Sequence, residues 1–414
     1  MPTYLPVVRS NPISHLNWTY VLVGIADGSL LTFIPLLLFE RGLTAAQIGV
    51  VLAAAAGVSL VAGLVWGYLV DRGLRAEGML VIASACAVIV ALMLALTGGG
   101  VALALVVVAL YVARSPLMLL DPIALRRLRT ARRTDYARIR LRMSAGWAGS
   151  VVLSGGAFQA LSLRLLPFVY APLAAIVGLW VWRFIKPVEV TPVAGDAIAH
   201  PAPMNARLPL AMVSFLLSLF LLGAALSATQ NFLTVQIDIL GGGAFLIGAA
   251  SAFQALTEIP TMGYTHVLSR FASQKVLFAI GCAIYVVIFI AWAFTTNALV
   301  AALLKLVVGV AFALTYVAAV VITEELSPPH LRATSQALMK SVTFGLAPIF
   351  GALAGGFLYS AAGPRAMFLT STALMLVAGV VVLIAVPTRR NAAAALPSAP
   401  APALQPAAAA VDEA

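Results

Sequence analysis

Charged side chains are scarce in this chain of 414 residues: Asp, Glu, Lys and Arg make up 9% of it, and hydrophobic residues make up 62%. A soluble globule carries about a quarter charged residues, because its surface must interact with water. A water-soluble enzyme or binding domain is therefore excluded. The composition predicts an integral membrane protein whose main surroundings are a lipid bilayer.

Cysteine and histidine are also rare, with two and four residues in the chain. Cys86 and Cys282 fall within apolar runs and are interpreted as small core residues. The histidines show no ligand spacing, so we predict no metal and no bound cofactor. The loops contain no nucleotide-binding loop, nucleophile triad or paired catalytic carboxylates, and they are too short for a catalytic domain. We expect no enzyme activity.

Long apolar runs fill most of the remainder. A spanning helix needs about 20 apolar residues, and in lipid only helices and closed barrels satisfy the backbone. Runs of this length predict helices rather than barrel strands. The first run is too long for the apolar part of a signal peptide. Charged, Gly and Pro residues separate these runs and so predict twelve spans, at 16–39, 46–70, 79–97, 101–120, 143–162, 167–184, 208–234, 244–268, 276–294, 298–323, 333–359 and 366–387.

The chain divides into two halves at a polar, Pro-rich stretch. We predict an all-α fold in which two six-helix bundles (16–186 and 208–390) are joined by a linker at 187–207, with an N-terminal segment at 1–15 and a disordered Ala/Pro tail at 391–414. The pattern from Gly42 to Gly49 recurs from Gly242 to Gly248. Such a repeat is expected in a two-bundle transporter with its site between the bundles.

The net charge of +11 is unevenly distributed. If the N-terminus is cytoplasmic, most Lys and Arg residues fall in inside segments, whereas the outside loops hold Arg41, Arg164 and Arg365. This asymmetry predicts that both termini lie in the cytoplasm, most simply at the plasma membrane. Positive loops beside an anionic leaflet explain the charge, so no nucleic-acid partner is predicted.

Span two ends in Gly67-Tyr68-Leu69-Val70-Asp71-Arg72-Gly73-Leu74-Arg75. This stretch resembles the loop 2–3 signature of the major facilitator superfamily. Gly63 and Gly67 present a small face for helix packing. Asp71, with Arg72 and Arg75 beside it, is suited to a contact with the other bundle that breaks when the bundles rock. We interpret Gly67, Asp71, Arg72 and Arg75 as a conformational gate.

Further stretches narrow this resemblance to the phenylpropionate permease-like and lactose permease-like symporters. They are Pro35 to Gly49, Asp135 to Trp147, Glu258-Ile259-Pro260 and Leu331 to Ala337. The resemblance implies a secondary transporter, and symporters of this kind use a carboxylate in span eight.

Five ionisable residues lie well within predicted spans, away from their ends: Asp27, Arg114, Glu258, Lys305 and Lys340. Each costs about 2.5–3.5 kcal/mol at a helix centre, so each is a candidate for function. Depth along the helices pairs Asp27 with Arg114, and Glu258 with Lys340 better than with Lys305.

Glu258 and Asp27 are the predicted proton-coupling residues. Desolvation and a nearby cation act on a carboxyl pKa in opposite directions, so occlusion or loss of an ion pair can change its protonation near neutral pH. A static ion pair, and for Asp27 direct contact with the solute, remain alternatives. The excess of cations over carboxylates favours an organic anion as solute. Predicted binding residues are Arg114, Lys305, Lys340, Tyr20, Tyr111, Gln230, Asn231, Gln254 and Tyr316.

The sequence thus predicts a monomeric transporter that imports a small organic solute by alternating access, driven by a proton gradient. Efflux of a drug-like or biosynthetic product by the same fold is one alternative. A transport-inactive membrane sensor or scaffold is another, although buried charges without transport would only reduce stability. Accumulation measured with and without a protonophore separates import from export.

Overall fold

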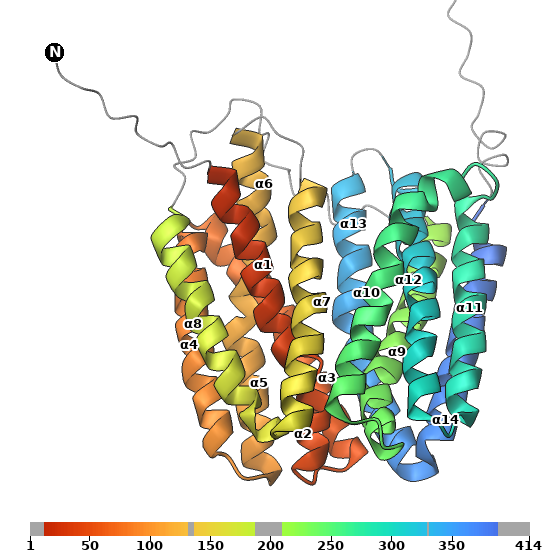
Figure 1. Ribbon diagram of the computed structural model, residues 1–414. Coiled ribbons are helices and arrows are strands. Elements are labelled where there is room, and N and C mark those ends of the chain that lie inside the picture. Colours follow the sequence, from red (N-terminus) through yellow and green to blue (C-terminus); the bar gives the residue numbers. More distant parts are fainter. Residues whose placement is uncertain (1–11, 131–135, 187–208, 329–330, 388–414) are drawn as a thin grey trace, which may run out of the picture.

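A computed structural model describes residues 12–130, 136–186, 209–328 and 331–387, and every regular element in these ranges is a helix (Figure 1). The predicted linker at 187–207, the predicted tail at 391–414 and most of the N-terminal segment at 1–15 lie outside the described residues.

The first half of the chain forms one group of helices, drawn from red to yellow in Figure 1. In chain order these are α1 (Pro12–Leu30), α2 (Ile34–Glu40), α3 (Ala45–Asp71), α4 (Ala76–Leu96), α5 (Gly100–Arg114), η1 (Ser115–Leu119), α6 (Leu120–Thr130), α7 (Tyr136–Ala160), η2 (Leu163–Leu165) and α8 (Leu166–Phe184).

The second half forms a second group, drawn from green to blue beside the first. Its elements are α9 (Leu210–Ile239), α10 (Gly243–Leu268), α11 (Gln274–Phe294), α12 (Ala298–Leu326), α13 (Arg332–Ser341), η4 (Val342–Leu346) and α14 (Ala347–Ala385). The two groups meet mainly where α3 packs on α14 and α7 packs on α10.

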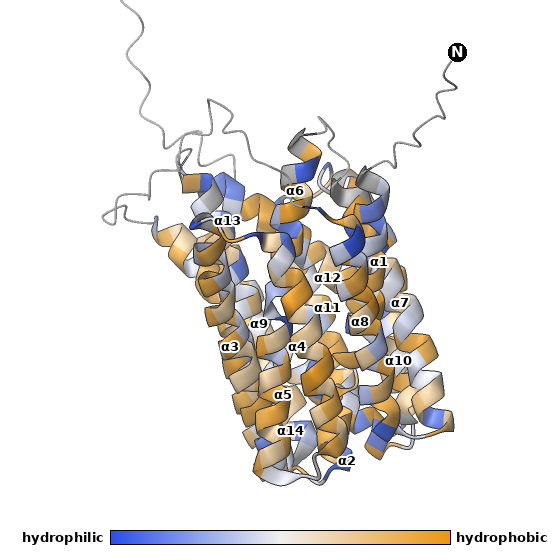
Figure 2. Ribbon diagram, turned by 90° about the vertical axis from the view of Figure 1, so that its left-hand side faces the viewer, coloured by the Kyte–Doolittle hydropathy of each residue, from blue (hydrophilic) through white to orange (hydrophobic). Residues whose placement is uncertain are grey.

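These helices are suited to a bilayer, because an α-helix satisfies its own backbone groups where water is absent. Among the described residues, nine segments are long and apolar enough to cross a membrane. Figure 2 shows hydrophobic residues along the length of the bundle and hydrophilic ones gathered mainly near its ends. Helices α7 and α10, with 25 and 26 residues, are as long as these segments but are not among the nine. The protein is therefore a multi-pass membrane protein.

The ends of several predicted spans need correction. The first span is not continuous, because the chain turns between Leu30 and Ile34 and α2 begins with Pro35 in its first turn. Span four continues past residue 120 through η1 into α6. Span five begins at Tyr136 rather than 143. The eleventh span comprises α13, η4 and the first limb of α14, and the twelfth is the second limb. The two limbs meet at Gly363, where the backbone is not helical (φ 81°).

The two groups pack most closely at the end where α3 and α10 begin, which is the lower end in Figure 1 and is called the closed end below. A Cβ on Gly49 would lie 2.5 Å from the carbonyl oxygen of Ala352, and a Cβ on Gly155 would lie 2.7 Å from that of Ala244. Only glycine permits such an approach of two backbones.

The contacts at the closed end occur twice, in equivalent form. Gly49 faces Ala352 across α3 and α14, as Gly248 faces Val151 across α10 and α7. The Ala46 amide donates to Ser360 Oγ (2.7 Å), and at the repeated position the Phe245 amide donates to Gln159 Oε1 (3.4 Å). Each bond satisfies an otherwise unpaired amide at a helix start with a side chain from the other group.

Candidate functional site

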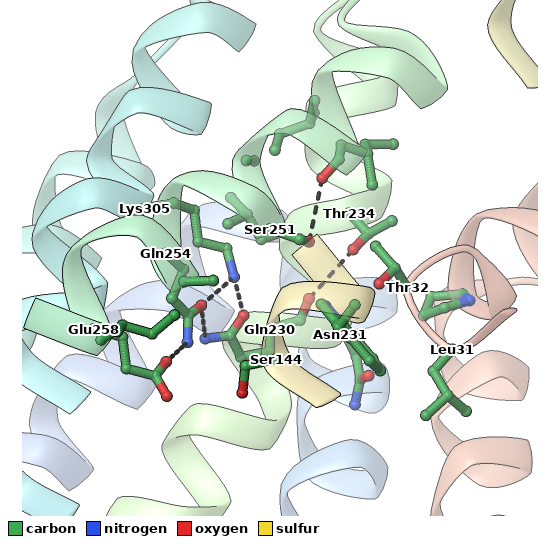
Figure 3. Close-up of a pocket in the computed structure, with 18 of the residues that line it drawn as sticks. Leu31, Thr32, Ser144, Gln230, Asn231, Thr234, Ser251, Gln254, Glu258 and Lys305 are labelled. Carbon is green, nitrogen blue, oxygen red and sulfur yellow. Dashed lines mark hydrogen bonds between the residues drawn. The ribbon is translucent and has the colours of Figure 1, made fainter. Parts of the chain in front are cut away.

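A cavity of about 500 Å³, the central cavity, lies between the two groups. Helices α7, α9, α10 and α12 and the turn between α1 and α2 contribute to its walls. Its polar lining residues are Thr32, Arg140, Ser144, Trp147, Gln230, Asn231, Thr234, Ser251, Gln254, Glu258 and Lys305. Figure 3 shows most of these side chains and the hydrogen bonds among them. The volume suits a small organic molecule.

A chain of hydrogen bonds joins the buried Lys305 ammonium to the half-buried Glu258 carboxylate (Figure 3). Lys305 Nζ donates to Gln230 Oε1 and, at 3.0 Å, to Gln254 Oε1. Gln254 Nε2 in turn lies 3.5 Å from Glu258 Oε2 and donates to it. Gln254 therefore separates the ammonium group from the carboxylate and contacts both.

Local helix geometry explains this arrangement. Gln254 and Glu258 are four residues apart on α10 and so share one face. Gly309 of α12 approaches that turn so closely that a Cβ on it would lie 2.8 Å from the Glu258 amide nitrogen. Thr257 Oγ1 donates to the Leu306 carbonyl (2.6 Å). These contacts hold Lys305, the residue before Leu306, beside Gln254.

A second cavity of about 230 Å³, the side cavity, lies within the first group. Arg114 Nη2 donates to Asp27 Oδ1 on its wall, and the two side chains are 12% and 9% exposed. The Arg114 guanidinium also lies 5.8 Å from the centre of the Tyr111 ring. Arg140 and Met143 line both cavities, so the side cavity adjoins the central one.

The predicted residues are distributed over these two cavities. Gln230, Asn231, Gln254, Glu258 and Lys305 line the central cavity, and Asp27, Tyr111 and Arg114 line the side cavity. Tyr20 is buried and donates to Asp121 Oδ1 (2.6 Å), and Asp121 lines the side cavity.

Two predicted binding residues lie elsewhere. Tyr316 stacks on Phe312, with ring centres 5.6 Å apart, in a small and mostly apolar pocket of the second group. Lys340 is exposed near the end of α13 and is not among the residues that line either cavity.

The structure confirms the predicted pairing of Asp27 with Arg114. The expected pairing of Glu258 with Lys340 is wrong, because Gln254 links Glu258 to Lys305 instead. Helix rise gives the depth of a residue but not the direction in which its side chain points. The Gln254 side-chain amide and the long Lys305 side chain together span the difference in depth between Glu258 and Lys305.

The gate residues lie at the end opposite the closed end. Arg72 is exposed, with its guanidinium 4.6 Å from the centre of the Tyr68 ring, and Arg75 is exposed at the start of α4. A Cβ on Gly67 would meet nothing within 4 Å, so no other helix packs on it here. The side chain of Asp71 lies outside the described part of the structure, and its predicted contact stays a prediction.

Sequence reasoning missed several lining residues, of which Arg140 is the most important. Arg140 appears in the sequence as one of many basic residues in an inside loop, yet it lies within α7 and reaches both cavities. A periodic signal was available, because Arg140, Ser144 and Trp147 follow helical spacing on one face.

Comparisons with known proteins agree with this fold. The model of the MFS_1 like family matches residues 14–370. The maltose permease of Geobacillus stearothermophilus is 27% identical over 386 residues, which is 90% of this chain and 94% of the permease. The family and this permease are transporters rather than enzymes.

Solved structures of transporters share the fold. The nucleoside transporter NupG superposes with a TM-score of 0.74 at 21% identity, covering 92% of this chain and 100% of NupG. A second structure is a bacterial homologue of the human lysosomal transporter Spinster in an inward-facing and occupied conformation. It gives a TM-score of 0.68 at 15% identity, and the match covers 92% of this chain and 97% of the homologue's chain.

Proposed function

Because this chain belongs to the MFS_1 like family, within the major facilitator superfamily, we propose that it is a proton-coupled importer of a small polar solute. The observation that carries the proposal is the bonded set Lys305, Gln254 and Glu258 on the wall of a 500 Å³ cavity between the two groups. Charges at this depth are costly unless an aqueous pathway reaches them.

The proposed topology has twelve spans with both termini in the cytoplasm. The nine apolar segments, the two long helices α7 and α10, and the division of the Thr334–Ala385 segment at Gly363 support that number. The positive-inside asymmetry supports the orientation, at the plasma membrane. The closed end then faces outward, and this conformation opens toward the cytoplasm.

The proposed solute is a neutral polyhydroxylated compound such as a sugar or a nucleoside. The central cavity offers three side-chain amides (Gln230, Asn231 and Gln254), four hydroxyls and the Trp147 ring. Such groups donate and accept hydrogen bonds and cover an apolar ring face, as a sugar requires. The names of the similar maltose permease and nucleoside transporter are consistent with this class.

An organic anion is the second candidate. Arg140 and Lys305 bring two positive charges to the central cavity, whereas Glu258 brings one negative charge. A carboxylate on the solute would balance that excess. Arg114 contributes less to this argument, because its guanidinium is already paired with Asp27.

Glu258 is the proposed proton carrier, with Asp27 as the second carboxylate of the pathway. As a carboxylate, Glu258 accepts a hydrogen bond from Gln254. A proton on Glu258 would remove its charge and leave the Lys305 charge unopposed within the cavity. Solute and proton would thus act on one connected set of side chains, and coupling of this kind requires no bound cofactor.

The test is transport by the purified protein in lipid vesicles with an imposed pH gradient, over a panel of radiolabelled sugars, nucleosides and organic anions. We expect the gradient to drive accumulation of one class. Glu258→Gln should abolish that accumulation and spare the exchange of solute across equilibrated membranes. Unchanged accumulation in Glu258→Gln would refute the proton role, and accumulation of organic anions alone would favour the second candidate.

A further inference from the structure

A groove of about 160 Å³, the lateral groove, lies in the second group between α9 and the two limbs of α14. It is separate from the central and side cavities, with which it shares no lining residue. Its walls are mostly small or apolar, and they include Ala224, Ala228, Gly351, Ala354 and Gly355.

The crossing of α9 and α14 produces this groove. A Cβ on Gly355 would lie 2.7 Å from the Ala228 Cβ, so the two backbones nearly touch there. To one side of the crossing the rings of Phe220 and Phe350 meet edge to face, with centres 5.4 Å apart. The small residues at the crossing leave unfilled space beside these large rings, and the second limb of α14 forms the remaining wall.

The groove offers almost no hydrogen bonding. Thr370 and Ser371 are its hydroxyl-bearing residues. Ser371 Oγ already donates to the Met367 carbonyl (3.0 Å), and Thr370 is exposed at the edge. Water binds in a cavity where it finds two to four polar partners, and an apolar cavity of about 150 Å³ stays dry and accepts benzene or xenon. The fitting ligand is therefore apolar.

The groove opens onto the surface that faces lipid. Phe350 on its wall is 52% exposed, and two other large apolar side chains near the groove on α9 and α14 are about half exposed, Leu217 (53%) and Phe357 (54%). In a membrane-spanning chain such a surface contacts the hydrocarbon of the bilayer. The mouth of the groove is continuous with it.

We propose that the lateral groove binds a hydrocarbon chain of a membrane lipid. The hydrocarbon chain makes dispersion contacts with the small wall residues, and these contacts would be absent if the groove were empty. It needs no polar partner and reaches the groove directly from the bilayer. The lipid then contacts α9, the helix whose Gln230 and Asn231 also line the central cavity.

The test uses the full chain in vesicles of phosphatidylethanolamine and phosphatidylglycerol doped with a phospholipid that carries a diazirine in one acyl chain. After illumination, mass spectrometry locates the labelled residues. We expect labelling of the groove segments 220–228 and 350–358 to exceed, severalfold per residue, that of other lipid-facing helices such as α4 and α11. Even labelling of all lipid-facing helices would overturn the proposal.

Ala354→Leu, which extends a side chain from the exposed edge into the groove, should lower labelling of the groove severalfold. Ala373→Leu is the matched control, because Ala373 is also exposed, lies at a similar distance from Gly363 on the other limb, and does not line the groove. Ala354→Val provides a smaller filling if Ala354→Leu fails to fold. Labelling that neither filling variant lowers would also overturn it.

Discussion

Arg114 and Asp27 form an ion pair between α5 and α1, at the wall of the side cavity, where both side chains are largely buried. The pair joins two helices of the first group. Neither charge is stable alone at this depth, because a lone buried charge keeps its desolvation cost without the attraction of its partner.

Asp27→Asn should therefore destabilise the protein strongly, by about 3–5 kcal/mol, because it leaves the Arg114 guanidinium uncompensated. The double variant Asp27→Asn with Arg114→Gln should recover a large part of that loss. Thermal unfolding of the purified protein in detergent measures both. Equal melting temperatures for the single variant and the unchanged protein would show that the ion pair does not contribute to stability.

Gln254→Leu should reduce solute binding by about tenfold or more. It removes an acceptor of the Lys305 ammonium and the donor to Glu258, and hydrogen bonds to charged groups contribute about 1.5–3 kcal/mol each. Equilibrium binding of the solute identified in the transport panel provides the measurement. Gln236→Leu is the control, because Gln236 accepts from Tyr359 (2.8 Å) and does not line the central cavity. Equal losses in both variants would contradict a specific role for Gln254.

Arg140→Gln should lower uptake by about tenfold, since Arg140 reaches both cavities and supplies a charge-assisted donor. Arg142→Gln is a close control: Arg142 is exposed on the same helix and lines neither cavity. We expect Arg142→Gln to transport normally. If the solute is an organic anion, Arg140→Lys should restore part of the uptake; a neutral solute should gain less. Similar uptake by both glutamine variants would remove Arg140 from the site.

Gly49→Leu should shift the protein toward a state that opens at the closed end, because its Cβ would lie 2.5 Å from the Ala352 oxygen. The readout is labelling of Asn231→Cys by a membrane-impermeant maleimide added outside, which should become severalfold faster. Gly149→Leu is the control, since a Cβ there meets nothing within 4 Å. A labelling rate that Gly49→Leu leaves unchanged would show that this contact does not keep the end closed.

The sequence was sufficient to predict the class of fold and to identify the charged side chains whose burial in a membrane costs free energy. Apolar runs of about 20 residues can only become spanning helices in lipid. The charges within them, including Asp27, Arg114, Glu258 and Lys305, were therefore identifiable without any structure.

Depth along the helices predicted the correct partner for one buried charge and the wrong partner for another. It correctly joined Asp27 of α1 to Arg114 of α5. It failed for Glu258, because the rotation of α12 and α13 about their axes is set by packing against neighbours. That rotation directs Lys305 into the central cavity and leaves Lys340 exposed.

The sequence by itself thus determined that this protein forms helices in a membrane and that some residues within them are charged. The free-energy cost of burying polar groups in hydrocarbon can be assessed without knowing how the helices pack. Tertiary structure alone decided which charges share a cavity and that Arg140 lines two cavities. It also decided that small residues beside α9 leave a groove open to lipid. These features depend on how helices distant in the chain rotate and approach one another, and hydropathy along the sequence carries no information about that.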